Sequence, residues 1–524
     1  MSMTPSIPLW QVYELALQSN KRYANPVQEA ALTVRFTSPS GNKRTIYGFW
    51  DGGDTWRARF APDEIGEWTF IAICSDETNS GLHQQTGHFT CGDPAGSTRF
   101  EQHGPIRLSD NRRYFAHADG APFFWMADTA WNGPLRSTDE EWQHYITERV
   151  RQQFTAVQWV ATQWLTAPDG DIEGQQAYSG NERIEINPAF FQRLDKKLEA
   201  LVRAGLLNVI TLLWAAEWRP EPEINATNPG FALPEDQAIL LARYMVARWN
   251  AYPVAYFLPG DGPYLGEKAA RWKRIGQGVF ASIDHAPVTL HPNGMSWYVN
   301  EFDDQDWLDY IGYQSGHGDD VPTVSWLVDG PPATGWQHLR PRPIVNLEPP
   351  YEDHIGYQSR QRFTADDVRK RLYWSLLVSP TAGVTYGGHG VWGWDDGTEP
   401  PLNHPTTGVP KPWREALLLP GAEQVIHLTD FFNAIDWWRL LPAREMVVNQ
   451  PGAHRHIAAS RSAAGDLAVV YVPEDRQIEL NLDGLRPALN TTWFNPRTGE
   501  RCAALGQQGR FETPAPGDWL LLFA

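Results

Sequence analysis

The first part of the chain is a series of short runs rich in β-branched and aromatic residues, several of them alternating between apolar and polar positions. Turn-forming clusters at 38–43 (SPSGNK) and 51–54 (DGGD) separate these runs. Strands and turns at such close spacing are typical of an antiparallel β-sandwich. The sequence therefore predicts an N-terminal β-sandwich domain over residues 1–95, with strands at 30–36, 44–50, 55–60 and 67–74. The Gly- and Pro-containing stretch that follows is expected to be a linker.

From residue 105 to residue 437, apolar runs alternate with segments of helical periodicity. Thr138 with Glu141 is a helix-start signal and Gly205 a helix-stop signal, whereas helix signals are weaker after the fifth and sixth strands. The alternative, a doubly wound open sheet, lacks the glycine-rich loop expected after its first strand. The pattern predicts a (β/α)8 barrel, with strands at 123–131, 154–162, 207–214, 254–261, 287–292, 308–317, 343–349 and 383–392.

The last part of the chain, 438–524, returns to short β-rich runs. Turns such as 463–466 (AAGD) and 495–500 (NPRTGE) separate them, so a second β-sandwich is predicted there. The whole chain is then a multidomain α/β protein, a TIM barrel flanked by N-terminal and C-terminal β-sandwich domains.

Composition narrows the class of protein. Hydrophobic residues make up 42% of the chain and charged residues 20%, which is typical of a folded globular protein. The net charge of −18 argues against nucleic acid or an anionic membrane as a partner. Twenty-five Trp residues indicate large cores, platforms on which sugars stack, or both. Cys74, Cys91 and Cys502 lack metal-ligand spacing and are expected to be free thiols.

Neither a signal peptide nor a membrane-spanning segment is visible in the sequence. The start, MSMTPSIPLW, has neither a basic nor an apolar signal-peptide region, and no apolar run approaches the roughly 20 residues of a membrane span. The chain as given is therefore expected to be cytoplasmic; it would be secreted or periplasmic if a signal has been removed. A homo-oligomer is left open.

Polar and aromatic residues at the ends of the barrel strands are the candidates for a site, because barrel active sites lie at the C-terminal ends of the strands. Glu348 is notable among them, since it ends an apolar strand and is followed by two prolines. The candidates in chain order are Asp128, Trp131, Trp159, Trp214, Asp261, His291, Gln314, His317, Glu348, Tyr351, His389 and Trp392.

Two carboxylates across the mouth of a barrel are the minimum equipment for glycoside hydrolysis, one as acid and one as nucleophile or base. Asp261 on the fourth strand and Glu348 on the seventh fit this pattern. The structural alternatives are that Asp261 caps a helix or turn and that Glu348 forms a salt bridge with nearby Arg340 or Arg342. Asp-rich loops such as 317–320 (HGDD) are read as ordinary turns, so no metal site and no cofactor are predicted.

Several stretches resemble the apiosidase-like family of glycoside hydrolases. They are 122–131 (PFFWMADTAW), 254–261 (VAYFLPGD), 313–317 (YQSGH), 348–354 (EPPYEDH) and 384–392 (VTYGGHGVW). The two flanking regions are similar to the N-terminal β-sandwich and the C-terminal collagen-binding-type β-domain that often accompany this barrel. One difference is Pro259 before Gly260 and Asp261, where the family has Gly-Gly-Asp.

The resemblance implies a glycosidase with Asp261 as acid/base and Glu348 as nucleophile. We therefore expect a retaining, apiosidase-like or related exo-glycosidase that acts on a glycoside or oligosaccharide. The remaining candidates are expected to bind the sugar. Two alternatives stay open, an endo-acting glycanase and a non-catalytic carbohydrate- or matrix-binding protein.

Overall fold

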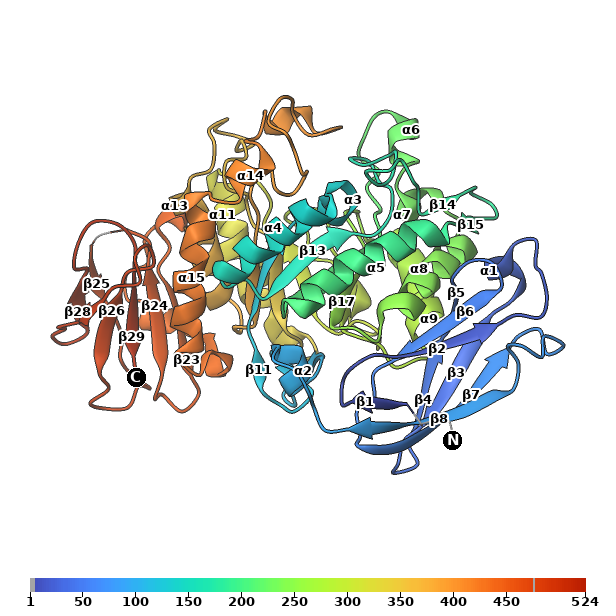
Figure 1. Ribbon diagram of the computed structural model, residues 1–524. Helices are drawn as coiled ribbons and strands as arrows, with labels where there is room; N and C mark the ends of the chain where they lie inside the picture. The colour runs from blue at the N-terminus through green and yellow to red at the C-terminus, as the bar shows by residue number, and fades with distance from the viewer. Residues whose placement is uncertain (1–4, 475) are drawn as a thin grey trace.

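The computed structural model describes residues 5–474 and 476–524. Two β-domains lie on opposite sides of a central barrel (Figure 1). The first has two antiparallel sheets, apart from the parallel pairing of its edge strand β1: β1-β8-β7-β3-β4 and β2-β6-β5. These strands are β1 (Ser6–Pro8), β2 (Tyr13–Gln18), β3 (Leu32–Thr37), β4 (Lys43–Tyr47), β5 (Phe49–Trp50), β6 (Thr55–Phe60), β7 (Gly66–Cys74) and β8 (Gln85–Gly92).

The segment predicted as one strand at 44–50 is two strands in different sheets, β4 and β5. The chain passes between the sheets at Gly48, where a Cβ atom would lie only 2.5 Å from the side chain of Leu32. The linker also differs from the prediction, because it contains helix α2 (Arg99–His103), which begins with a Thr98/Glu101 capping box. Cys74, Cys91 and Cys502 are free thiols, as expected.

The central part is the predicted barrel. Its eight strands are parallel and follow chain order around the ring, in the order β18-β17-β16-β13-β12-β21-β20-β19. The ring is nearly closed, since β18 and β19 do not pair as strands but are joined by Thr289 Oγ1, which donates to the carbonyl of Tyr310 at 2.6 Å. The strands are β12 (Trp125–Thr129), β13 (Ala156–Val160), β16 (Leu207–Leu213), β17 (Val254–Pro259), β18 (Val288–Thr289), β19 (Ile311–Gln314), β20 (Ile344–Glu348) and β21 (Gly383–Tyr386).

Helices surround the barrel, and their ends follow the sequence signals. The Thr138/Glu141 capping box begins α4, and Gly205 at φ +73° follows the end of α5. After β18 the chain forms only the short α10 (Val299–Phe302), in agreement with the weak helix signal there. The longer barrel helices are α4 (Asp139–Arg151), α5 (Pro188–Arg203), α8 (Glu235–Trp249), α9 (Glu267–Phe280), α11 (Val321–Val328), α13 (Ala365–Leu377) and α15 (Pro420–Asn433).

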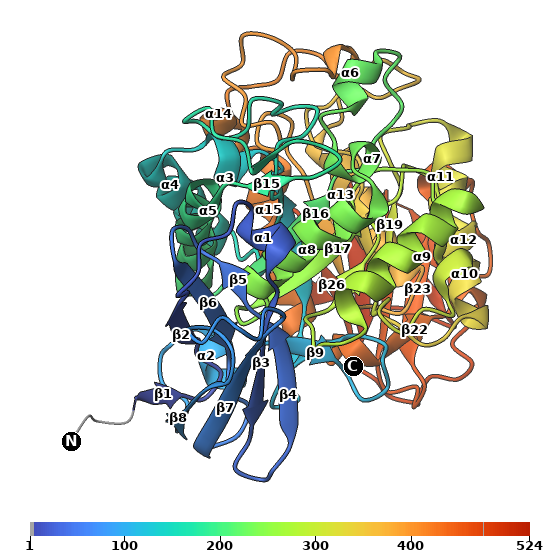
Figure 2. The same ribbon diagram turned by 90° about the vertical axis from the view of Figure 1, so that its right-hand side faces the viewer.

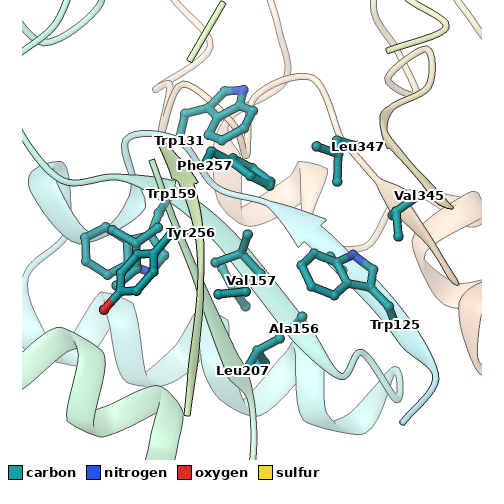
Figure 3. Packing of buried hydrophobic residues seen from close by; sticks show 14 of the residues in the cluster. Trp125, Trp131, Ala156, Val157, Trp159, Leu207, Tyr256, Phe257, Val345 and Leu347 are labelled. Carbon is teal, nitrogen blue, oxygen red and sulfur yellow. The ribbon is translucent and has the colours of Figure 1, made fainter. Parts of the chain in front are cut away.

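Successive side chains of a strand point to opposite faces of the barrel wall. Figure 3 shows Trp159 and Tyr256 side by side, away from Trp125 and Leu347, and all four are fully buried. Trp159 packs against Trp249 of α8, with ring centroids 5.7 Å apart. Trp159 therefore belongs to the layer between the wall and the helices.

The C-terminal domain is a six-stranded antiparallel sheet, β22-β23-β24-β29-β26-β27, with a two-stranded sheet, β25-β28. It is fixed to α13 by Arg369, whose guanidinium forms two contacts of 2.7 Å with buried Asp518. The strands are β22 (Leu440–Pro442), β23 (Ala458–Ser462), β24 (Ala468–Val472), β25 (Gln477–Glu479), β26 (Thr491–Phe494), β27 (Arg501–Ala503), β28 (Arg510–Glu512) and β29 (Trp519–Phe523).

The N-terminal domain is held to the barrel by a buried ionic network. Arg59 of β6 and Arg248 of α8 both contact Asp195 of α5, at 2.8 and 2.7 Å. The loops that follow β16 and β21 contain α6 (Pro222–Asn225) and α14 (Trp413–Ala416). In two perpendicular views they lie above the C-terminal ends of the barrel strands (Figures 1 and 2). None of the helices within the described residues is long and apolar enough to cross a membrane.

Candidate active site

A cavity of about 450 Å³ opens at the C-terminal ends of the barrel strands. Asp261 and Glu348 both line it, so the structure brings the two predicted carboxyl groups to one space. Six of the other candidates line the same cavity: Trp131, Trp214, Gln314, His317, Tyr351 and Trp392. A volume of this size is in the usual range for a small-molecule site.

Glu348 is the last residue of β20, and each oxygen of its carboxylate faces a histidine. Nε2 of His317 lies 2.9 Å from Oε1, and Nε2 of His291 lies 3.6 Å from Oε2. Burial acts to raise the pKa of Glu348, but the hydrogen bond from His317 holds this pKa below its ordinary value. The neighbouring arginines do not reach it, since Arg340 pairs with Asp306 and Arg342 with Asp303.

Asp261 follows β17 by two residues, and its side chain is 22% exposed. Its Oδ1 accepts a hydrogen bond of 2.5 Å from the amide of Gln314 and lies 3.2 Å from Nδ1 of His291. Burial raises the pKa of Asp261, and the charge of Glu348 adds to the rise, whereas a proton on Nδ1 of His291, donated to Asp261, would oppose it. Asp261 does not cap the next helix, because α9 begins at Glu267 with Gly266 as its N-cap.

Aromatic rings form much of the cavity wall. Trp131 and Trp214 meet edge to face, with ring centroids 5.3 Å apart. The indole N–H of Trp131 donates to the hydroxyl of Tyr351 at 3.1 Å, and this tyrosine also hydrogen-bonds Glu348. The wall is thus tied to the carboxylate that it surrounds. Apolar faces beside a few fixed polar groups suit a sugar ring, which has both kinds of surface.

Four of the candidates do not line the cavity. Trp159 packs on α8, as described above. His389 is buried and accepts the indole N–H of Trp392 at 3.2 Å, so it supports a wall residue from behind. His291 is also buried, but it touches both carboxyl groups. Asp128 points away from the cavity and pairs with buried Arg149 of α4 at 2.7 Å.

This geometry replaces a sugar-binding role for Asp128 with a structural one. We expect Asp128→Asn to lower the free energy of unfolding by about 3–5 kcal/mol, because Arg149 would remain buried without a counter-charge. Urea unfolding followed by Trp fluorescence measures the loss. Asp110→Asn, whose side chain is 95% exposed in a surface pair with Arg107, is the control and should change little. A raised KM with unchanged stability would instead favour contact between Asp128 and the substrate.

Several cavity residues were not among the candidates. They lie in the loops beyond the strands: Trp164, Trp218, Arg219, Met295, His354, Tyr357, Asn403 and His404. The loops carry no periodicity that would place their side chains, although the number of Trp residues was a signal. Glu217, another acid after β16, does not line the cavity and pairs with Lys268. Among the described residues no cluster of three or more His, Cys, Asp or Glu is arranged for a metal.

Comparison with known proteins agrees with this architecture. The profile described as "Apiosidase-like, catalytic domain" matches residues 109–439. A domain of unknown function, DUF5060, matches residues 6–75, and the "Putative collagen-binding domain of a collagenase" matches residues 441–523. No curated protein matches the chain in sequence.

Solved structures share the fold at low sequence identity. A structure titled "Glycoside hydrolase" is 22% identical with a TM-score of 0.69, covering 82% of this chain and 98% of its own. A family 5 glycoside hydrolase from Bacteroides vulgatus ATCC 8482 is 19% identical with a TM-score of 0.70, covering 82% and 94%. A "putative glycoside hydrolase" from the same organism is 18% identical with a TM-score of 0.72, covering 99% of both chains. The resemblance seen in the sequence is confirmed: the chain belongs to the apiosidase-like family, and its barrel is a glycoside hydrolase catalytic domain.

Proposed function

We propose that the protein is a retaining exo-glycosidase in which Glu348 attacks the anomeric carbon and Asp261 protonates the leaving oxygen. The observation that supports this most directly is that one imidazole, His291, touches both carboxyl groups at 3.2 and 3.6 Å. One ring and two such contacts keep the facing oxygens within the upper limit of about 9.5 Å that glycosidases use. A binding protein has little need for such a pair.

The pKa directions assign the two roles. The pKa of Asp261 is raised by burial, which favours the protonated form that an acid needs. The pKa of Glu348 is lowered by its histidine partners, which favours the anion. A carboxylate with a lowered pKa is a weak base toward water but remains able to attack carbon, so the nucleophile role, and with it retention, suits Glu348 better.

The reaction then has two balanced steps. In the first, a Glu348 oxygen bonds to the anomeric carbon, the glycosidic bond breaks, and the Asp261 proton moves to the leaving oxygen. In the second, the Asp261 carboxylate takes a proton from water, the water oxygen bonds to the anomeric carbon, and the bond to Glu348 breaks. Both carboxyl groups end as they began.

The residues that line the cavity and the name of the apiosidase-like family together indicate the class of substrate. Trp131, Trp214 and Trp392 offer apolar faces to a sugar ring, while Gln314 and Asn403 are among the polar groups beside them. The loops after β16, β20 and β21 also contribute lining residues, which favours a pocket for one chain end over an open groove. Apiose, the sugar of the family name, is therefore the first terminal residue to test.

The stereochemistry of the product tests the mechanism. With a panel of aryl glycosides and apiose-containing glycosides, the wild type should release a single terminal sugar, first as the anomer of the substrate. Proton NMR in the first minutes of the reaction resolves the two anomers. The opposite anomer would make Glu348 the base that activates water, and internal cleavage would favour the endo-acting alternative. Binding without turnover of any glycoside would favour a carbohydrate-binding protein.

A further inference from the structure

The two histidines beside Glu348 approach its two oxygens with the same ring nitrogen. His317, from the loop after β19, places Nε2 at 2.9 Å from Oε1. His291, from the loop after β18, places Nε2 at 3.6 Å from Oε2. A neutral histidine ring carries one proton, on Nδ1 or on Nε2. The partner of Nδ1 determines which of the two nitrogens carries it.

For His317, the backbone determines the tautomer. The N–H of Tyr351 points at Nδ1 of His317 at 3.3 Å, and a backbone N–H can only donate. Nδ1 must therefore be the acceptor, and the proton of the neutral ring lies on Nε2. His317 thus donates to Glu348 and stabilises its anionic form.

For His291, the side chain of Gln314 has the same effect. Its amide nitrogen lies 3.1 Å from Nδ1 of His291 and 2.5 Å from Oδ1 of Asp261, and its two N–H groups are enough for both contacts. Nδ1 of His291 is again the acceptor, so the ring proton lies on Nε2. That nitrogen has no hydrogen-bond partner within the described residues, and the oxygen facing it is Oε2 of Glu348.

This tautomer has opposite consequences for the two acids. The lone pair on Nδ1 of His291 lies 3.2 Å from Oδ1 of Asp261. This lone pair, which also accepts the Gln314 N–H, repels a carboxylate there but accepts a shared, three-centre hydrogen bond from a carboxylic acid. We propose that Gln314 holds His291 in the Nε2–H tautomer, and that this one neutral ring keeps Asp261 protonated and Glu348 ionised. His291 and Gln314 are then positioning residues, in a proposal that rests on the function assigned above.

The surroundings fix the orientation of the ring. His291 is fully buried, and Trp131 and Phe257 each pack against it with ring centroids 5.1 Å away. The other titratable groups that influence Asp261 or Glu348 are tyrosines and one further histidine: Tyr264, Tyr351, Tyr357 and His404. Arg219 also lines the cavity.

The same ring also serves the second step. Once Asp261 has given up its proton, its carboxylate faces the Nδ1 lone pair of His291 across 3.2 Å. The repulsion makes Asp261 a stronger base toward the incoming water, and the hydrogen bond to His291 re-forms when the proton is taken up. Asp261 can then act as acid and as base in turn without a change in its surroundings.

The pH profile of His291→Phe tests the proposal, since phenylalanine keeps an aromatic ring but has no ring nitrogen. In kcat/KM the acid limb reports Glu348 and the basic limb Asp261. We expect the basic limb to move down and the acid limb up, each by about half to one pH unit, because Asp261 loses the acceptor that favours its protonated form and Glu348 loses the facing Nε2–H that favours its anion. The pH range over which kcat/KM is high therefore becomes narrower on both its acidic and its basic side.

The opposite tautomer gives the opposite sign. If Nδ1 of His291 carried the proton and donated to Asp261, the basic limb of His291→Phe would move up, and the proposal would be wrong. Nitrogen-15 NMR of histidine-labelled protein reads the tautomer directly in the wild type, with His291→Phe used to assign the signal. A protonated Nδ1 at His291 would also overturn the proposal. Failure of the proposed function is distinguishable, since it would appear as a wild type without glycosidase activity.

Discussion

Glu348→Gln should lower kcat about 10³-fold or more on the best substrate of the wild type. An amide oxygen has the shape of the carboxylate but is a poor nucleophile, so the covalent intermediate no longer forms. The hydrogen bond from His317 Nε2, 2.9 Å in the wild type, can still be accepted by the amide oxygen. The substituted enzyme should therefore bind substrate and fail at the chemical step. Single-turnover and steady-state kinetics on the glycoside panel separate these two effects.

Glu352→Gln is the matched control, because Glu352 is a buried glutamate four residues further along the chain. It accepts hydrogen bonds from the hydroxyl of Tyr386 at 2.7 Å and the backbone N–H of Gly421 at 2.8 Å, and it does not line the cavity. Its replacement should affect stability and leave kcat per folded molecule close to the wild-type value. Equal kcat values for Glu348→Gln and the wild type would show that the nucleophile lies elsewhere.

The barrel was predictable because its signals are local and repeated. Each strand is an apolar run, and signals such as the Thr138/Glu141 capping box and Gly205 mark where helices begin and end. Strand lengths were overestimated, most clearly at β18, where only Val288–Thr289 is strand within the predicted 287–292. The remainder of that run leaves the wall as loop and carries His291. The division of 44–50 between two sheets was missed because it depends on the close approach of Gly48, between β4 and β5, to Leu32 of β3, which is distant in the sequence.

The carboxyl pair was predictable for a related reason, since the ends of parallel strands meet at one end of the barrel. What the sequence did not show was which way each side chain points. Asp128 lies outside the wall against Arg149, and Trp159 lies against Trp249. A strand that is buried on both faces shows no alternation of polar and apolar residues. Its sequence therefore does not indicate which residues face the inside of the barrel and which face the helices. His291, expected at the sugar, instead lies behind both acids.

Asp261→Asn should lower kcat/KM about 10²–10⁴-fold for substrates with a poor leaving group, such as an alkyl or sugar alcohol. These leaving groups need a proton as the bond breaks, and asparagine has none to give. An acidic phenol can leave as the phenolate without that proton, so aryl glycosides of such phenols should still form the intermediate rapidly. Its hydrolysis then becomes slow because the base for water is also lost, which predicts a burst of phenol and a lowered KM.

The raised pKa of Asp261 adds a second signature to the same variant. In the wild type, activity should fall on the basic side as Asp261 loses its proton, and in Asp261→Asn this limb should disappear for the activated aryl substrates. Asp309→Asn is the control, since Asp309 is another partly buried aspartate with a raised pKa, about 6, but lies before β19 at the N-terminal end of the barrel. It should keep both the basic limb and the wild-type dependence on leaving group. A uniform loss for all leaving groups in Asp261→Asn would assign this carboxyl to substrate binding and place the proton donor on another residue.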